Sequence, residues 1–147
     1  MNIIYKDTKR NEVSKEGMYI FTDNTDRSSG RNLIGDWNWY GKKYGKMKCY
    51  PHSTTSQLRG LENAYPITLQ KHCFSKGSYK GGQWLDEEFD EFKKYIDEDI
   101  AKIKEDLPKY KYIVLPEGGL FGRPISEITQ ERTPRLFMYL LKQLINL

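Results

Sequence analysis

Apolar residues recur at steps of four and three between residues 85 and 107, which is the spacing of one face of an α-helix. Pro108 ends this pattern, and Asp86, Glu87 and Glu88 stand where the positive end of a helix dipole favours negative charge. The pattern predicts one long helix over residues 85–107, with its other carboxylates forming a solvated face. The apolar stripe consists of Leu85, Phe89, Phe92, Ile96, Ile100, Ile103 and Leu107.

A second helix is expected over residues 134–146. Thr133 is a suitable N-cap residue, and Pro134 suits the first helical turn. The apolar positions that follow are three and four residues apart, so they form one apolar face. These positions are Leu136, Phe137, Leu140, Leu141 and Leu144.

Four short apolar or alternating runs are typical of strands and fall near residues 3–5, 18–22, 67–72 and 111–115. The long helix separates the last two runs, and a right-handed β-α-β crossover is the natural arrangement for that order of elements. The expected fold is therefore α/β. It is a single domain over residues 1–147, with a mixed central β-sheet, a long crossover helix and a C-terminal helix.

The segment after the last predicted strand carries glycines and then arginines. Gly118 and Gly119 allow backbone conformations that other residues resist, and Arg123, Arg132 and Arg135 follow them. Loops after the strands of α/β sheets often form the ligand crevice, and arginines beside free backbone N–H groups bind anions. A phosphate group is the first candidate ligand. The alternative is a tight connection from strand to helix with solvated arginines.

Two further segments combine short polar side chains with arginine. The first follows a predicted strand directly and includes Asn24, Thr25, Arg27 and Ser28. Such residues can hold an anion with side-chain and backbone donors, but they also form ordinary surface turns, and both interpretations stay open. The second segment, residues 51–64, includes Thr54, Thr55, Gln57 and Arg59.

Aromatic residues between positions 33 and 50 are interleaved with lysines and glycines in no clear period. Trp37, Trp39 and Tyr40 are suited to stack on nucleotide bases while neighbouring lysines neutralise phosphate. They are equally suited to an interface between subunits, where Tyr and Trp concentrate. A third interpretation is that the two tryptophans complete the core.

Composition narrows the class of ligand. A net charge of +4 fits a phosphate-bearing small molecule better than a long nucleic acid, which usually meets a denser basic stripe. No apolar run approaches membrane-spanning length, and the N-terminus lacks the apolar region of a signal peptide. Cys49 and Cys73 form no CxxC pair, which argues against a disulfide scaffold. A cytosolic protein that binds no membrane is expected.

Groups suited to catalysis are sparse. The two histidines, His52 and His72, lie near Cys49 and Cys73 in the sequence. His72 and Cys73 are adjacent, and neighbours on a strand point to opposite faces, so this pair is poorly spaced to bind one zinc ion. Glu117 is a single carboxylate, and the sequence holds neither a Walker loop nor a GxGxxG motif. This balance favours binding over turnover, with no metal ion and no cofactor.

Three segments carry a resemblance to known proteins: residues 18–30 (MYIFTDNTDRSSG), residues 50–60 (YPHSTTSQLRG), and residues 115–123 (LPEGGLFGR) together with residues 131–135 (ERTPR). Over most of its length the chain resembles a family of small proteins from T-even-type bacteriophages, which includes the anti-CBASS sponges. Those sponges sequester the cyclic-dinucleotide alarm signal of the host without cleaving it. The resemblance implies an anti-defence protein in the host cell cytoplasm. Residues 28–31 (SSGR) replace a denser glycine run of more distant relatives, which leaves the ligand open.

The residues and the resemblance together predict non-catalytic binding of a cyclic dinucleotide such as 3′3′-cGAMP. Arginines would contact phosphate, short polar residues would read base edges or ribose, and aromatic residues would stack. A homo-oligomer, dimer or tetramer, is expected because a two-fold axis presents matching donors to a two-fold ligand. The ligand-binding residues would be Asn24, Thr25, Arg27, Ser28, Trp37, Trp39, Tyr40, Thr54, Thr55, Gln57, Arg59, Gly118, Gly119, Arg123, Arg132 and Arg135.

Two other functions fit the same residues. One is an enzyme acting on a nucleotide or an ADP-ribose-like compound, with Asn24, His52 or Glu117 near the reacting centre. The other is an inhibitor of a host protein that uses the aromatic segment as its interface.

Overall fold

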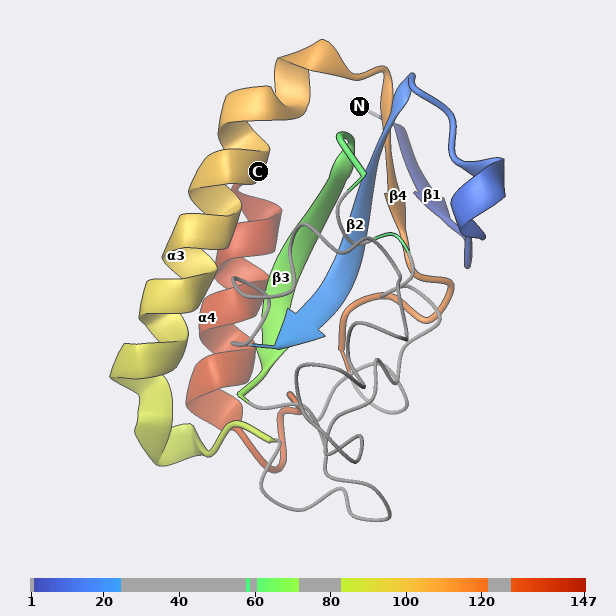
Figure 1. Cartoon of the computed structure of the whole chain (residues 1–147). Helices are drawn as coiled ribbons and strands as arrows, with labels where there is room; N and C mark the ends of the chain where they lie inside the picture. The colour runs from blue at the N-terminus through green and yellow to red at the C-terminus, as the bar shows by residue number, and fades with distance from the viewer. Residues whose placement is uncertain (1, 25–57, 59–60, 72–82, 122–127) are drawn as a thin grey trace, which may run out of the picture.

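The computed structural model describes residues 2–24, 58, 61–71, 83–121 and 128–147, and they form two layers (Figure 1). One layer is a sheet of four strands, and the other consists of two helices packed on one face of it. The helices are α3 (Phe89–Asp106) and α4 (Pro134–Ile145), and short 3-10 turns occur at η1 (Arg10–Glu12), η3 (Asp86–Glu88) and η4 (Leu107–Lys109). The strands are β1 (Asn2–Tyr5), β2 (Gly17–Asn24), β3 (Ala64–Gln70) and β4 (Tyr112–Leu115).

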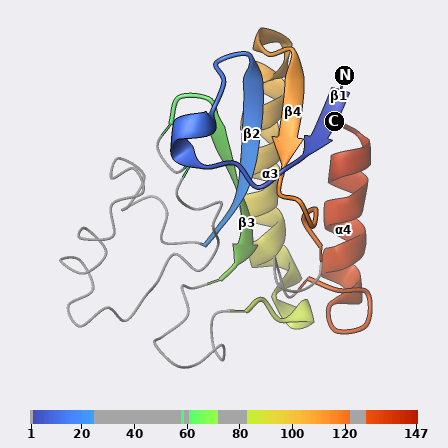
Figure 2. The same cartoon turned by 90° about the vertical axis from the view of Figure 1, so that its right-hand side faces the viewer.

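The strands follow the order β1-β4-β2-β3 across the sheet, and the upper part of the sheet in Figure 2 shows them as β3, β2, β4 and β1 from left to right. The α/β class, the crossover helix between β3 and β4, and the C-terminal helix are therefore confirmed. Every pairing among the described strands is parallel, so the sheet is not mixed as expected. The connection from β1 to β2 and the helix α3 between β3 and β4 return the chain to the end of the sheet where the next strand starts, as parallel pairing requires.

The core lies between the sheet and the two helices. Side chains alternate between the faces of a strand, so Met18 and Ile20 of β2 and Ile67 and Leu69 of β3 point to the helices. There they meet the buried stripe of α3, fully buried Trp84, and Leu136 and Leu140 of α4. A smaller cluster on the other face contains Tyr19, Phe21, Leu58 and Val114. Each such side chain contributes roughly 1.5–3 kcal/mol through burial.

The stripe predicted for the long helix is correct except at its first position. Phe92, Ile96, Ile100 and Ile103 are buried, and Phe89 and Leu107 pack against them. Leu85 is 53% exposed instead. It has extended backbone and precedes the first helical turn, so the helical period does not apply to it.

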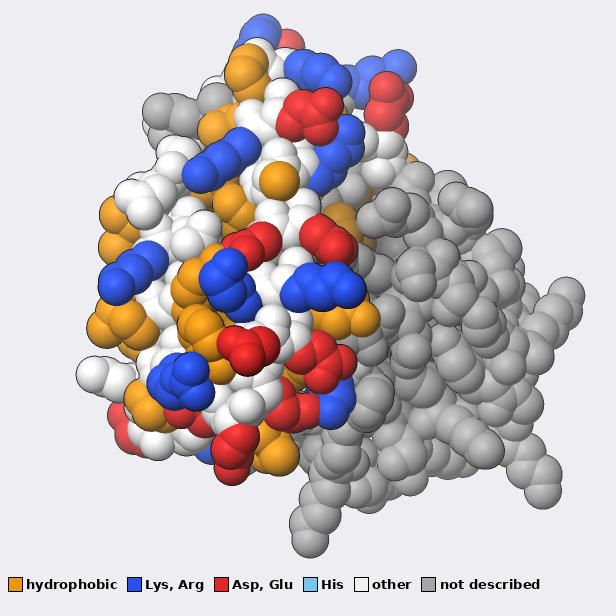
Figure 3. Space-filling model, turned by 90° about the vertical axis from the view of Figure 1, so that its left-hand side faces the viewer, with side chains coloured by type: hydrophobic (Ala, Val, Ile, Leu, Met, Phe, Trp, Pro, Cys, Tyr) orange, Lys and Arg blue, Asp and Glu red, His pale blue; other side chains and the backbone are white. Residues whose placement is uncertain are grey.

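The prediction that the carboxylates of α3 form a solvated face is only partly right. The outer side of the helix layer does carry interspersed acidic and basic side chains (Figure 3), among them the ion pairs of Lys93 with Asp97 and of Lys102 with Glu105. Asp99 and Asp106, however, are buried. Asp99 lies three residues after Ile96 and four before Ile103, and Asp106 lies three residues after Ile103, so the spacing of the apolar stripe already included them.

Candidate functional site

The carboxyl ends of three neighbouring strands point to the same edge of the sheet, and β4 ends at Leu115, level with Ile20 of β2. β2 and β4 are adjacent, with Tyr19 opposite Val114, and β2 then continues to Asn24, which pairs with Gln70 at the end of β3. Because all strands are parallel, the segments that follow β2, β3 and β4 leave the sheet at this same edge. In open α/β sheets ligands bind in the crevice outside the carboxyl ends. We call this region the carboxyl edge.

A tight turn follows β4 at the carboxyl edge. The Gly119 N–H donates to the carbonyl of Pro116 over 2.8 Å, and Gly119 adopts a φ of +80°, which only glycine tolerates readily. The Glu117 N–H donates to Oδ1 of Asp7 over 3.0 Å, which ties the turn to the segment after β1. Two of the backbone donors that the sequence offered for an anion are therefore already used within the protein.

The N-terminus of α4 is also occupied. Oδ1 of Asp86 accepts hydrogen bonds from the N–H groups of Arg135 at 2.9 Å and Leu136 at 3.2 Å. Thr133 is the N-cap residue as predicted, but its side chain makes no cap hydrogen bond. Its hydroxyl exchanges hydrogen bonds with Thr129 instead. Asp86 thus supplies the negative charge that the helix dipole favours, from another element.

Two of the predicted arginines, Arg132 and Arg135, lie in the described part of the chain, at the start of α4. This end of α4 is at the bottom of Figure 1, and the strands point toward it. The Arg135 guanidinium lies 4.5 Å from the centre of the Phe89 ring, a cation–π contact on an exposed side chain. Arg132 is half-buried, and its backbone N–H donates to the Thr129 hydroxyl over 3.1 Å. Of the arginines predicted to bind phosphate, Arg132 and Arg135 are therefore the two that the described residues place at this edge.

A further cation stands where β3 ends. Lys71 forms an ion pair with Glu88 of η3 and lies 4.0 Å from Glu91 of α3. The hydrogen bond to Glu88 raises the pKa of Lys71. This pair joins the end of β3 to the start of the helix. Sequence reasoning missed it because the two residues are seventeen positions apart, with no periodic relation.

Most of the predicted ligand-binding residues lie outside the described residues. Asn24 ends β2 and so lies at the carboxyl edge, and Gly118 and Gly119 belong to the turn after β4. No group of three or more metal-ligating side chains occurs within residues 2–24, 58, 61–71, 83–121 and 128–147. Outside those residues are Thr25, Arg27, Ser28, Trp37, Trp39, Tyr40, Thr54, Thr55, Gln57, Arg59 and Arg123, together with Cys49, His52, His72 and Cys73.

A buried polar cluster joins β3 to the end of α3. The Tyr65 hydroxyl donates to Oδ2 of Asp106 over 2.7 Å and lies 3.1 Å from the Tyr110 hydroxyl. Hydrogen bonds from Tyr65, Lys109 and Lys102 lower the pKa of Asp106 to about 2. Burial, followed by the hydrogen bond to Asp106, raises the pKa of Tyr65. Both groups are fixed in one protonation state at neutral pH, so the cluster is suited to structure and not to proton transfer.

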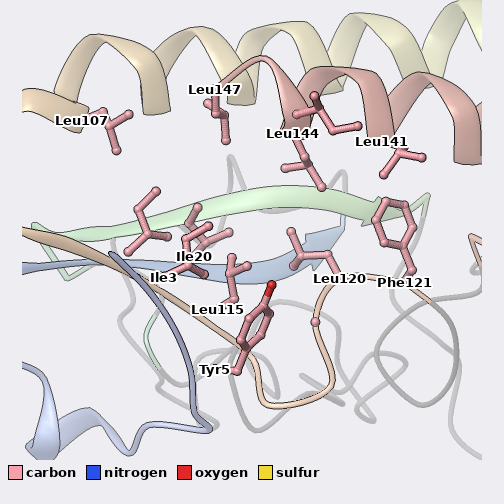
Figure 4. Close-up of a pocket in the computed structure, with 13 residues that line it drawn as sticks. Ile3, Tyr5, Ile20, Leu107, Leu115, Leu120, Phe121, Leu141, Leu144 and Leu147 are labelled. Carbon is pink, nitrogen blue, oxygen red and sulfur yellow. The ribbon is translucent and has the colours of Figure 1, made fainter. Parts of the chain in front are cut away.

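An apolar groove of about 450 Å³ lies between α4 and the strands β1 and β4 (Figure 4). Leu141, Leu144 and Leu147 form one wall, and Ile3 and Leu115 lie opposite them. Leu120 and Phe121, just after the turn, also line it. The groove therefore extends from the turn after β4 along the C-terminal part of α4.

Comparison with known proteins gives one match. A family model described as "Family of unknown function (DUF7831)" matches residues 2–143. Neither a curated protein nor a solved structure matches the chain. Among the described residues, no helix is long and apolar enough to cross a lipid bilayer.

Proposed function

The chain belongs to the family of unknown function DUF7831, and we propose that it binds a phosphate-bearing nucleotide at the carboxyl edge and does not cleave it. The observation that carries this proposal is the adjacency of β2 and β4 in a parallel sheet. The polar segment after Asn24 and the turn after Leu115 start from neighbouring strands, although 91 positions separate these two residues in the sequence. Such an edge is where α/β sheets bind nucleotides.

The phosphate contacts in this proposal come from side chains. The N–H groups of Glu117, Gly119 and Arg135 are already bonded within the protein, so they are not the donors for an anion. Arginine guanidinium groups give charge-assisted and often bidentate hydrogen bonds to phosphate. Arg132 and Arg135 stand at this edge, and Arg27, Arg59 and Arg123 are the further candidates from the sequence.

The ligand class we propose is the cyclic dinucleotides, with 3′3′-cGAMP as the specific candidate. The resemblance to phage anti-CBASS sponges supports this choice, and so does the combination of arginines with base-stacking aromatic residues in the sequence. Sequestration in the host cytoplasm then lowers the free concentration of the immune signal. The sparse proton-transfer groups of the sequence support binding without turnover.

Retention followed by release tests the proposal. The purified protein is mixed with a panel of cyclic dinucleotides, linear dinucleotides and ADP-ribose, separated from free ligand, and heat-denatured, and the released compound is chromatographed. We expect a cyclic dinucleotide to be retained and released intact. A chemically altered product contradicts sequestration and favours the enzyme acting on a nucleotide or ADP-ribose-like compound. No retention of any member of the panel contradicts nucleotide binding and favours inhibition of a host protein.

A further inference from the structure

Most of the exposed large apolar side chains of the described residues lie on or beside β1. Three of the six belong to this strand, and Ile145, at the C-terminal end of α4, lines the apolar groove together with Ile3 and Tyr5. Side chains alternate along a strand, so Ile4 points to the opposite face of the sheet, as does its partner Val114. We call this set the β1/α4 patch, and it consists of Ile3, Ile4, Tyr5 and Ile145.

The outer edge of β1 has backbone groups directed away from the sheet. The Lys6 N–H donates to the carbonyl of Leu115 over 2.9 Å. Backbone groups alternate in direction along a strand, so Asn2 and Ile4 also direct their N–H and C=O groups toward β4. Ile3 and Tyr5 direct their N–H and C=O groups away from β4, to the outer edge of the sheet. β1 ends one side of the described sheet, so no described strand pairs with these groups.

The other edge of the sheet is closed by side chains. At Thr68 of β3, the N–H donates to Asp99 of α3 over 2.8 Å and the carbonyl accepts from Nε1 of Trp84 over 3.3 Å. Pro66, two residues earlier, has no N–H to offer. A strand of another molecule can therefore pair at β1 but not at this part of β3. Head-to-tail growth from β1 to β3 is blocked.

We propose that two copies of this chain associate through the β1/α4 patch, with their β1 strands antiparallel about a two-fold axis at Ile4. Ile3 of one copy then stands opposite Tyr5 of the other, and each such pair exchanges two backbone hydrogen bonds. The result is one continuous eight-stranded sheet. Ile145 of each copy and the groove that it lines lie on one face of this sheet, and the two Ile4 side chains meet on the other face. This proposal is independent of the nucleotide proposed above.

Charge and symmetry favour a second copy as the occupant. Edge strands usually carry charged residues or proline that prevent pairing, but β1 carries neither between Asn2 and Tyr5. Identical uncharged strands meet without like-charge repulsion, and an isologous contact closes at two copies. The four side chains of the patch are 41% to 72% exposed, and the backbone edge of β1 and the groove walls extend the surface that a second copy can cover.

A charge reversal of the patch tests the proposal by sedimentation velocity at micromolar concentration. Ile4→Lys places two ammonium groups across the two-fold axis, so we expect the mass to halve and the dissociation constant to rise by more than about tenfold. Leu85→Lys is the matched control, since Leu85 is equally apolar and exposed but lies outside the patch; it keeps the wild-type mass. Circular dichroism of both variants checks that each is folded.

Cross-linking gives an independent readout that does not depend on a destabilised variant. Ile4 faces its own copy in a pair without mutual hydrogen bonds, where the Cα atoms lie roughly 4.5 Å apart and a disulfide fits. Ile4→Cys is expected to form a disulfide dimer under mild oxidation, whereas Leu85→Cys is not, with Cys49 and Cys73 present in both. A monomeric wild-type protein, or an oligomer that neither Ile4 variant alters, would overturn the proposal.

Discussion

The carboxylate of Asp99 in α3 holds two donors of a single residue in β3. Oδ2 of Asp99 accepts from the N–H and from the hydroxyl of Thr68, both at 2.8 Å, and both residues are buried. The same residue of β3 also accepts from Trp84. This arrangement fixes α3 against the strand and satisfies the backbone of an edge strand that has no further neighbour in the described sheet.

Asp99→Ala should destabilise the protein strongly, because it leaves buried donors of Thr68 without that acceptor. A buried donor left unpaired costs roughly 1–3 kcal/mol, so we expect a loss of about 2–4 kcal/mol in the free energy of unfolding. Urea denaturation measures it. Thr68→Val is the matched comparison, since it removes only the hydroxyl bond and should cost less. Equal effects of the two variants would show that the bond to the backbone N–H contributes little.

The free energy of unfolding should decrease as the pH is lowered from about 4 to 2, because Asp106 becomes protonated in this range. The hydrogen bond from Tyr65, with those from Lys109 and Lys102, lowers the pKa of Asp106 from 3.8 to about 2 in the folded protein. A carboxyl with a lowered folded pKa stabilises the fold above its ordinary pKa, and this contribution disappears as the pH falls from about 4 toward 2. Asp106→Asn should flatten the pH dependence of urea unfolding in that window. A pH dependence that Asp106→Asn leaves unchanged would contradict this assignment.

The helix α4 should depend on a cap from outside its own sequence neighbourhood. Asp86→Ala removes the acceptor for the N–H groups of Arg135 and Leu136, which we expect to cost about 1 kcal/mol of unfolding free energy. Asp86→Asn keeps an acceptor oxygen and loses only the charge, so its cost should be roughly 0.3–1 kcal/mol. Thermal unfolding of both variants measures the difference. An alanine variant as stable as wild type would exclude Asp86 as the cap.

The turn after β4 should require glycine at one of its two glycine positions. Gly119 has a φ of +80°, and an added Cβ would meet nothing within 4 Å, so Gly119→Ala suffers backbone strain alone. We expect a loss of about 1–2 kcal/mol in stability. Gly118→Ala is the control, because Gly119 is the only described glycine with a positive φ. Denaturation of both variants measures the contrast, and a similar loss in both would contradict the conformational explanation.

Removing Arg132 should weaken ligand binding if the proposed site is correct. Loss of one charge-assisted hydrogen bond to phosphate is expected to cost roughly 1.5–3 kcal/mol, about ten- to a hundredfold in affinity for the retained nucleotide. Isothermal calorimetry on Arg132→Ala measures this. Arg132→Lys should recover only part of it, because lysine lacks the bidentate fork. Arg10→Ala, in η1, should bind like wild type, and equal affinity for all three variants would remove Arg132 from the site.

Much of the fold could be predicted from the sequence because helices and strands depend on local periodicity. The stripe from Phe89 to Leu107 and the face formed by Leu136 and Leu140 repeat at helical spacing, so they identify their helices without reference to the rest of the chain. The errors have two different causes. Leu85 precedes the first helical turn, and Asp99 and Asp106 are acidic residues at positions of the buried stripe.

The sequence by itself determined the elements, their order and the residue types available for an anionic ligand. Only the tertiary structure decided which segments meet, because the strand order β1-β4-β2-β3 depends on packing across the sheet and not on neighbours in the chain. It placed β2 beside β4 and so brought Asn24 and the turn at Gly119 to one edge. In the tertiary structure Asp7 accepts from the N–H of Glu117 and Asp86 from the N–H of Arg135, donors that from the sequence alone were expected to bind a ligand. Asp7 is 110 positions from Glu117 in the sequence, and Asp86 is 49 positions from Arg135. Local sequence patterns carry no information about contacts at such separations.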